Sequence, residues 1–287
     1  CGHDGHTTTL LYAAEYLART RQFNGTLQLI FQPAEELLYG GRVMVEDGLF
    51  DKFPCDLIFG LHNMPGQAVG NIGLRDGAMM ASSDTLHIEV KGVGGHGAVP
   101  EHTVDATLVA CHITLALQSI VSRNITPFEP AVVTVGSIQA GHAPNIINDK
   151  VLMKLTVRTL NEQVRETVLQ RIHDIAVAQA ESFNATATLT HVNGSPVLKN
   201  DPAANQMVRE VATSLFGEAQ VGEVKPFMGS EDFAFMLEHN PNGCYFTIGA
   251  GDEADRCMVH NPGYDFNDEI LLKGAALWCG LTEHYLR

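Results

Sequence analysis

The chain has 287 residues and a formal net charge of −15, from 18 Lys and Arg against 33 Asp and Glu. That length suits one or two domains with an ample core. The charge argues against nucleic acid or an anionic membrane as a partner, because both are bound through clustered Lys and Arg. No uninterrupted apolar run approaches the ~20 residues of a membrane-spanning helix. The six cysteines are scattered and several lie in apolar runs, which favours reduced thiols in a cytoplasmic protein.

The start of the chain carries two candidate metal ligands with nothing in front of them. Residue 1 is a cysteine rather than Met, and no strand precedes it. A thiolate ligand on a frayed terminus would be poorly held. We therefore expect that an N-terminal part of the domain is missing from this chain.

The first segment of the chain alternates helical and strand-like patterns. Residues 7–21 have helical periodicity, and residues 26–31 are rich in β-forming side chains. A short helix is expected over residues 33–45, followed by a buried strand over residues 55–63 that ends at His62. This order predicts an α/β fold with a mostly parallel sheet covered by helices.

From residue 84 the pattern changes to alternation of apolar and polar residues. Helices expected over residues 104–123 and 161–182 are interleaved with four strands in the order β-α-β-β-α-β. This is the ferredoxin-like order, and the alternation predicts an antiparallel sheet with helices on one face.

After residue 194 the helical and buried-strand patterns of the first segment return, with a strand over residues 244–251 and a last helix over residues 268–286. The simplest architecture is therefore a discontinuous α/β domain interrupted by an inserted α+β domain. We predict residues 1–83 and 194–287 for the first and residues 84–193 for the second.

Good metal ligands stand at the edges of several apolar segments. Cys1 and His3 open the first helix, and His62 and His260 each end or follow a strand. Open α/β sheets place their sites at the carboxyl ends of the strands, where such side chains can converge. A thiolate beside imidazole and carboxylate groups suits Zn, Mn, Co or Ni better than Mg or Ca. We predict a dinuclear site with the ligands Cys1, His3, Glu36, His62 and His260.

Glu35 and Glu36 are adjacent in the fragment Gln-Pro-Ala-Glu-Glu. Neighbouring side chains point in different directions, so one carboxylate can bind metal while the other faces the attacking water. Hydrolysis assisted by a metal needs this division, with a Lewis acid and a base side by side. We predict that Glu35 is the general base and that it later passes the proton to the leaving amine.

Each of these residues also has an ordinary structural interpretation. A small loop Cys, a capping His, acids in a first helical turn and a half-buried His at a strand end all occur without a metal. The prediction rests on the convergence of several independent ligand types in one region.

The inserted domain adds three polar residues at strand ends and loops. His96 lies in the glycine-rich loop GVGGHGAVP, Asn145 in HAPNIIN, and Arg158 at the end of a strand. Arg158 could hold a substrate carboxylate through two parallel hydrogen bonds, which an acidic protein needs for an anionic substrate. The alternative is that these are turn residues and a solvated strand end.

Together the fragments resemble a known family. CGHDGH, FQPAEE, FGLHN, GGHGAVP, NIIND, VRT, MGSEDF and HNPGYDFND follow one another from the first residue to near the last. This series resembles the amidohydrolase branch of the M20 metallopeptidase family, which includes hippurate hydrolases and N-acyl-amino-acid deacylases. The loop NIIND differs from many members, which have a Pro after the Ile.

The resemblance implies two divalent metal ions on the five ligands, with Glu35 as the base. It also implies a homodimer formed through the inserted domain, which then serves as a dimerisation and lid domain. In related members the equivalent of His96 reaches the neighbouring subunit's site and polarises the scissile carbonyl. Asn145 and Arg158 match positions that hold the substrate carboxylate.

These observations predict metal-dependent hydrolysis of the amide bond of an N-acyl or N-aroyl amino acid, which releases a carboxylic acid and a free amino acid. One alternative is a di- or aminopeptidase, or an acyl-glutamate carboxypeptidase, of the same family. A free-amine substrate would then require an acidic pocket for its ammonium group. The other alternative is not an enzyme but an inactive fragment or a dimerising scaffold.

Overall fold

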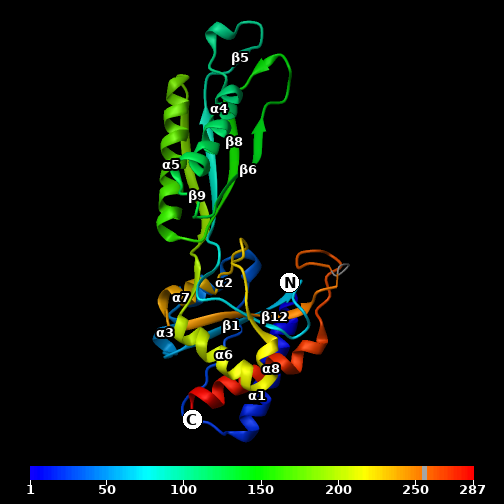
Figure 1. The fold of residues 1–287 in the computed structure, drawn as a ribbon. Coiled ribbons are helices and arrows are strands. Elements are labelled where there is room, and N and C mark those ends of the chain that lie inside the picture. Colours follow the sequence, from blue (N-terminus) through cyan, green and yellow to red (C-terminus); the bar gives the residue numbers. More distant parts are fainter. Residues whose placement is uncertain (254–256) are drawn as a thin grey trace. The chain divides into compact units, whose positions relative to one another are not determined.

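The computed structural model describes residues 1–253 and 257–287 and divides the chain into two compact units (Figure 1). The first unit comprises Cys1–Met79, Leu198–Pro226 and Asp232–Arg287, and the second comprises Met80–Val197 and Phe227–Glu231.

A four-stranded sheet forms the centre of the first unit. Its strand order is β1 (Ile58–Pro65), β12 (Gly243–Gly251), β2 (Ile72–Leu74) and β11 (Val221–Glu223). The β1–β12 and β2–β11 pairs are parallel and the β12–β2 pair is antiparallel. The sheet is therefore mixed, with more parallel than antiparallel pairs. Every residue of β12 is buried, as expected for a central strand with both faces covered.

Three long helices pack around this sheet. They are α1 (His3–Thr20), α6 (Pro202–Phe216) and α8 (Leu271–Tyr285). α8 packs against both α1 and α6, and α6 packs on β12. The core between α6, α8 and the sheet includes Val208, Leu277 and Phe246.

Short elements complete the first unit. They are the helices α2 (Gly40–Glu46), α3 (Leu49–Lys52) and α7 (Ala234–His239), the 3₁₀ turns Glu35–Leu37, Glu218–Gln220 and Asp268–Ile270, and the two-stranded sheet of β3 (Gly77–Met80) and β10 (Leu198–Asn200).

Three expectations for the first unit are wrong in detail. Residues 26–31 form no strand, because a strand needs a ladder partner and none is assigned to them among the described residues. The helix expected over residues 33–45 is a 3₁₀ turn followed by the separate short helix α2. Strand β1 continues to Pro65, so His62 lies within the strand, opposite Thr247, and not at its end.

The second unit has the ferredoxin-like element order that the alternation predicts. The elements are β4 (Ser83–Lys91), α4 (Ala106–Ser119), β6 (Ala131–Ala140), β8 (Lys150–Thr159), α5 (Glu162–Ser182) and β9 (Thr186–Ser195), and the strands are ordered β6-β8-β4-β9. Every pair in this sheet is antiparallel. Alternate residues of β8 are buried beneath α4 and α5, which fits a sheet with one packed face.

Smaller elements of this unit are the ribbon of β5 (Gly95–His96) and β7 (Ile146–Ile147), a 3₁₀ turn at Pro100–His102 and a π-helical turn at Ile120–Asn124. By length and composition, one described helical stretch, Ala106–Asn124, could cross a membrane. Its apolar residues Val109, Ile113 and Leu117 are fully buried, so one face of the stretch belongs to the core of this unit.

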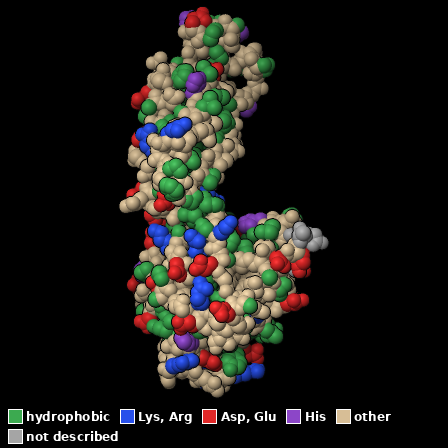
Figure 2. All heavy atoms as spheres, in the orientation of Figure 1, with side chains coloured by type: hydrophobic (Ala, Val, Ile, Leu, Met, Phe, Trp, Pro, Cys, Tyr) green, Lys and Arg blue, Asp and Glu red, His purple; other side chains and the backbone are tan. Residues whose placement is uncertain are grey.

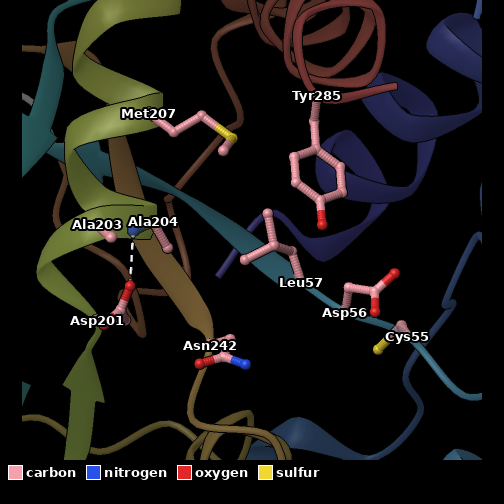
Figure 3. A pocket seen from close by; sticks show the side chains of 9 residues that line it. All are labelled: Cys55, Asp56, Leu57, Asp201, Ala203, Ala204, Met207, Asn242 and Tyr285. Atoms are coloured by element: carbon pink, nitrogen blue, oxygen red, sulfur yellow. Dashed lines mark hydrogen bonds between the residues drawn. The ribbon is translucent and has the colours of Figure 1, made fainter. Parts of the chain in front are cut away.

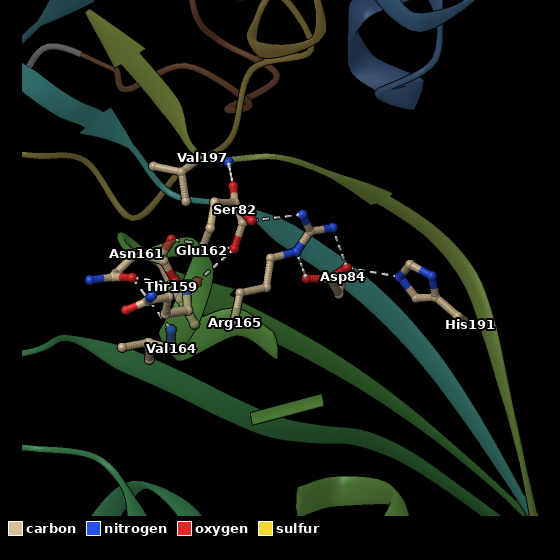
Figure 4. Close-up of polar contacts among 10 residues, drawn as sticks. Ser82, Asp84, Thr159, Asn161, Glu162, Val164, Arg165, His191 and Val197 are labelled. Carbon is tan, nitrogen blue, oxygen red and sulfur yellow. Dashed lines mark hydrogen bonds and ion pairs between the residues drawn. The ribbon is translucent and has the colours of Figure 1, made fainter. Parts of the chain in front are cut away.

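A buried ion pair links α5 to the sheet of the second unit (Figure 4). Asp84 on β4 is completely buried and accepts two hydrogen bonds of 2.8 Å from the Arg165 guanidinium, and His191 on β9 lies 2.8 Å from the same carboxylate. Glu162 contacts Arg165 and accepts the backbone N–H of Val197 at 2.6 Å. The strands that begin and end this unit are thereby held to one helix.

The surface carries charges of both signs. On the face drawn in Figure 2, acidic and basic side chains are intermixed, and the described side chains show no large basic patch there.

Candidate metal centre and active site

The amino end of α1 presents Cys1 and His3. Gly2 between them has φ +80°, a left-handed conformation that favours glycine. A Cβ atom at Gly2 would lie 2.9 Å from the ring of Phe266 and 3.2 Å from the ring of Tyr264. The glycine therefore lets the start of the helix approach the loop that follows His260.

The predicted ligands converge in three overlapping groups within the first unit. The potential ligand atoms of Cys1, His3 and His62 lie within 4.8 Å of one another, as do those of Cys1, Glu36 and His260 and those of His3, Glu35 and Glu36. These residues come from α1, β1, the 3₁₀ turn and the loop near residue 260. The structure thus brings together all six residues predicted for the metal and the base.

The carboxylates lie between the histidines. Glu36 Oε1 is 3.9 Å from His3 Nε2, and Glu36 Oε2 is 3.7 Å from His260 Nε2. Glu35 Oε2 is 3.6 Å from His3 Nε2. Glu36 therefore extends toward His260, whereas Glu35 contacts His3 alone among these histidines, so the two carboxylates have different surroundings.

The backbone around the two glutamates is unusual. Ala34 before them has φ +53° and Leu38 after them has φ +51°, both in the left-handed region. Non-glycine residues there cost of order 1–3 kcal/mol and cluster at functional sites. This tight conformation fixes the direction of both carboxylates.

Asp232 holds this loop at both ends. One of its carboxylate oxygens accepts the Gly41 N–H at 2.7 Å, and the other accepts the amide of Gln32. A Cβ atom at Gly41 would lie 2.5 Å from the Asp232 carbonyl oxygen, so this approach requires glycine. Asp232 is fully buried and is the residue that fixes residues 32–41 around the glutamates.

Burial, together with the negative charges of Glu36 and Asp232, raises the pKa of Glu35 to about 7. A carboxylate with a pKa near neutrality is suited to take up and release a proton at that pH.

Two histidines of the site, His3 and His62, are held neutral. Burial lowers the pKa of His62 to about 4 and also lowers the pKa of His3. Nδ1 of His62 donates to the backbone carbonyl of Asn63 at 2.6 Å, which leaves the lone pair on Nε2. A neutral imidazole with a fixed tautomer is the form that binds a metal ion.

The donor set fits the expected ions. The groups contain one thiol, three imidazoles and two carboxylates. These donors suit a transition metal such as Zn or Mn.

The other three predicted site residues belong to the second unit. His96 pairs with Ile146 in the β5–β7 ribbon, and the Gly97 N–H donates to the Asn145 carbonyl at 2.8 Å, so His96 and Asn145 are neighbours. His96 Nδ1 accepts the Ala98 N–H at 3.0 Å. A neutral His96 therefore carries its proton on Nε2, which makes that atom a hydrogen-bond donor.

Arg158 lies at the opposite end of β8 from the ribbon. Arg158 is eight steps along the strand from Lys150, a distance of about 26 Å at strand geometry. Arg158 donates to Ser230 Oγ at 2.6 Å, and burial lowers the pKa of its guanidinium. Within one chain the structure does not bring Arg158 together with His96 and Asn145.

A separate cavity of about 490 Å³ lies in the first unit (Figure 3). It is lined by Asp56, Asp201, Asn242 and Tyr285 around the apolar side chains of Leu57 and Met207, among others. It is near the amino ends of β1 and β12 and contains none of the predicted site residues.

Comparison with known proteins identifies the family. The model of peptidase family M20/M25/M40 matches residues 1–284. The chain belongs to this family. It is thus a hydrolase that acts on amide bonds, as the motifs predict.

Relatives within the family include several hydrolases. The chain is 44% identical to a hippurate hydrolase of Campylobacter jejuni, over all of this chain and 74% of the relative. It is 37% identical to an N-acetyl-L-cysteine deacetylase of Bacillus subtilis, over 96% of this chain and 64% of the relative. A solved dinuclear metal-binding peptidase of the M20 family from Bacillus subtilis superposes with a TM-score of 0.83 at 30% identity, over all of this chain and 72% of that chain.

Sequence reasoning missed three contributors to the site of this family member. His6 is not among the predicted site residues, yet the centroid of its ring lies 4.5 Å from that of His62. Its position three residues after His3 on the same helix was the available signal. Asn63 and Asp232 act through contacts with segments far away in the chain, which no spacing in the sequence reveals.

Proposed function

We propose that the protein hydrolyses the amide bond of N-acyl or N-aroyl amino acids and releases a carboxylic acid and a free amino acid. The convergence of Cys1, His3, His62, His260 and the two glutamates in one unit carries this proposal. The hippurate hydrolase and deacetylase among the relatives support the substrate class.

Two divalent ions would be held by Cys1, His3, Glu36, His62 and His260, with Mn or Zn preferred and Co or Ni possible by donor chemistry. When bound, they would supply Lewis-acid activation of the water and of the scissile carbonyl. The dinuclear peptidase of the same family supports the number of ions.

Glu35 is assigned as the general base. It takes a proton from the attacking water and returns it to the leaving amine, because its raised pKa allows both directions near pH 7. His96 is assigned to stabilise the developing oxyanion by donating a hydrogen bond from its Nε2–H. Asn145 and Arg158 are assigned to bind the substrate carboxylate.

We further propose that residues 1–83 and 194–287 form the catalytic domain and residues 84–193 a dimerisation and lid domain in a homodimer. The separation of Arg158 from His96 and Asn145 supports a dimer, because one chain cannot present all three to one small substrate from a rigid sheet. A cytoplasmic location accords with the free thiols.

The competing activities use different substrates. The test is amino-acid release from a panel of N-acetyl and N-benzoyl amino acids, free dipeptides and acyl-glutamates, with manganese or zinc added. Release confined to acylated substrates with varied amino acids supports the proposal. Release from free dipeptides or only from acyl-glutamates would overturn it in favour of a peptidase or carboxypeptidase. No metal binding and no release would favour a scaffold.

A further inference from the structure

Asn63 follows His62 in strand β1 and is completely buried. Its backbone and its side chain make polar contacts with three segments of the first unit, and each of these segments carries proposed metal ligands.

The first contact is within β1. The Asn63 carbonyl accepts the proton on His62 Nδ1 at 2.6 Å. A carbonyl oxygen can only accept, so this bond sets both the tautomer and the ring direction of His62.

The second contact is with α1. His6 Nε2 contacts two polar atoms of Asn63, the backbone nitrogen at 3.0 Å and the side-chain oxygen Oδ1. Depending on the tautomer of His6, this nitrogen accepts the Asn63 N–H or donates to Oδ1, but not both at once. His6 lies three residues after His3, with ring centroids 5.4 Å apart. Because its Nε2 is engaged by Asn63, His6 anchors the helical turn that bears Cys1 and His3.

The third contact is with the loop that follows His260. The Asn63 side-chain amide donates to the Tyr264 hydroxyl. The Tyr264 N–H in turn donates to the Asn261 carbonyl at 2.9 Å, which closes the turn next to His260. The hydroxyl contact therefore ties this turn to β1.

Close packing supports the same arrangement. A Cβ atom at Gly5 would lie 2.4 Å from the ring of Phe266, two residues beyond Tyr264. The glycines of α1 thus let the helix and the loop meet around Asn63, and a larger residue would force them apart.

We propose that Asn63, with His6 and Tyr264, forms a positioning group that sets the metal affinity of the site by fixing these three segments. These are positioning residues, because the contacts described run to ligand-bearing backbone and to one another. The inference rests on the metal centre proposed above.

The test titrates zinc into the metal-free protein by calorimetry. Tyr264→Phe removes only the hydroxyl group, and we expect zinc to bind about tenfold or more weakly, as for other groups that orient metal ligands. His6→Phe keeps the ring but loses both contacts to Asn63, and it should have the same effect, whereas His6→Gln restores a hydrogen-bonding group and should recover part of the affinity. Tyr16→Phe, on the exposed side of α1, is the matched control and should bind zinc as the wild type does.

A purely structural role would lower the unfolding temperature of the metal-free variants and leave the zinc affinity of the folded proteins unchanged. Wild-type zinc affinity in Tyr264→Phe and His6→Phe, with wild-type circular dichroism, would therefore overturn the inference. A wild-type protein that binds no zinc would instead refute the metal centre itself, and that result is seen before any substitution is compared.

Discussion

At the scale of single residues, the proposed metal centre depends most on histidines that stay neutral, because only a neutral imidazole can bind a metal ion. The pKa of His62 is about 4 in the folded protein against an ordinary value of 6.5. Between these two pH values the unfolded chain binds a proton that the folded chain does not, so stability is lost as the pH falls through this window. We expect protonation linked to His62 to lower the free energy of unfolding of the metal-free protein by up to about 3 kcal/mol between pH 7 and pH 4.

Urea unfolding of the metal-free protein at several pH values in this range measures that loss. His62→Gln should show a shallower pH dependence, while His173→Gln, at an exposed position on α5, should keep the wild-type slope. Equal slopes for the wild type and His62→Gln would show that burial of His62 does not couple to folding.

A second residue-scale prediction concerns Asp232. Its negative charge helps to raise the pKa of Glu35, after burial and Glu36. Asp232→Asn removes the charge and keeps the shape, so we expect the acid limb of the kcat/KM profile to move to lower pH. Asp51→Asn, at an exposed position on α3, should leave the limb in place. If the acid limb of the Asp232→Asn profile is unchanged or moves to higher pH, the Asp232 charge does not raise the pKa of Glu35.

At the scale of elements, a buried ion pair fastens α5 to the sheet of the second unit. Arg165→Met leaves the fully buried Asp84 carboxylate without its guanidinium, and removal of one partner of a buried pair costs about 3–5 kcal/mol. Arg19→Met breaks the exposed Arg19–Glu15 pair on α1 and should cost less than about 1 kcal/mol. Denaturant unfolding of both variants measures the difference, and similar costs would mean that the Asp84–Arg165 pair adds little.

Elements were predictable from sequence where a local pattern determines them. The ferredoxin-like order followed from alternating strands, because one packed face imposes a period of two. Residues 26–31 have the same composition, but a strand also needs a partner, and composition does not report one. The 3₁₀ turn at Glu35–Leu37 depends on the contacts of Asp232, some 200 residues away, and so could not be read from its own residues.

The site was predictable to the extent that ligand chemistry marks its residues. Cys, His and Glu side chains at segment ends identified the six residues that converge. The sequence does not mark His6 or Asn63, because their contacts depend on how segments distant in the chain pack together, and two of the Asn63 contacts use backbone atoms that any residue possesses.

At the scale of the whole molecule, the proposed dimer requires an apolar surface on the second unit. Leu115 and Leu108 lie seven residues apart on α4, and both are exposed, Leu115 by 71%. We expect Leu115→Glu to convert the dimer to a monomer in sedimentation velocity. Leu272→Glu, an equally exposed leucine (70%) on α8 of the first unit, is the matched control and should remain a dimer. A wild-type protein that sediments as a monomer would refute the dimer.

The most direct measurement compares amino-acid release by the wild type and by Glu35→Gln at equal metal content, on the best substrate of the acylated panel. We expect a chelator to stop release by the wild type. Loss of the base should lower the rate of Glu35→Gln by about 10²–10⁴-fold, while Glu15→Gln, on the exposed side of α1, should keep the wild-type rate. Undiminished release by Glu35→Gln with metal bound would contradict the assignment of Glu35 as the general base.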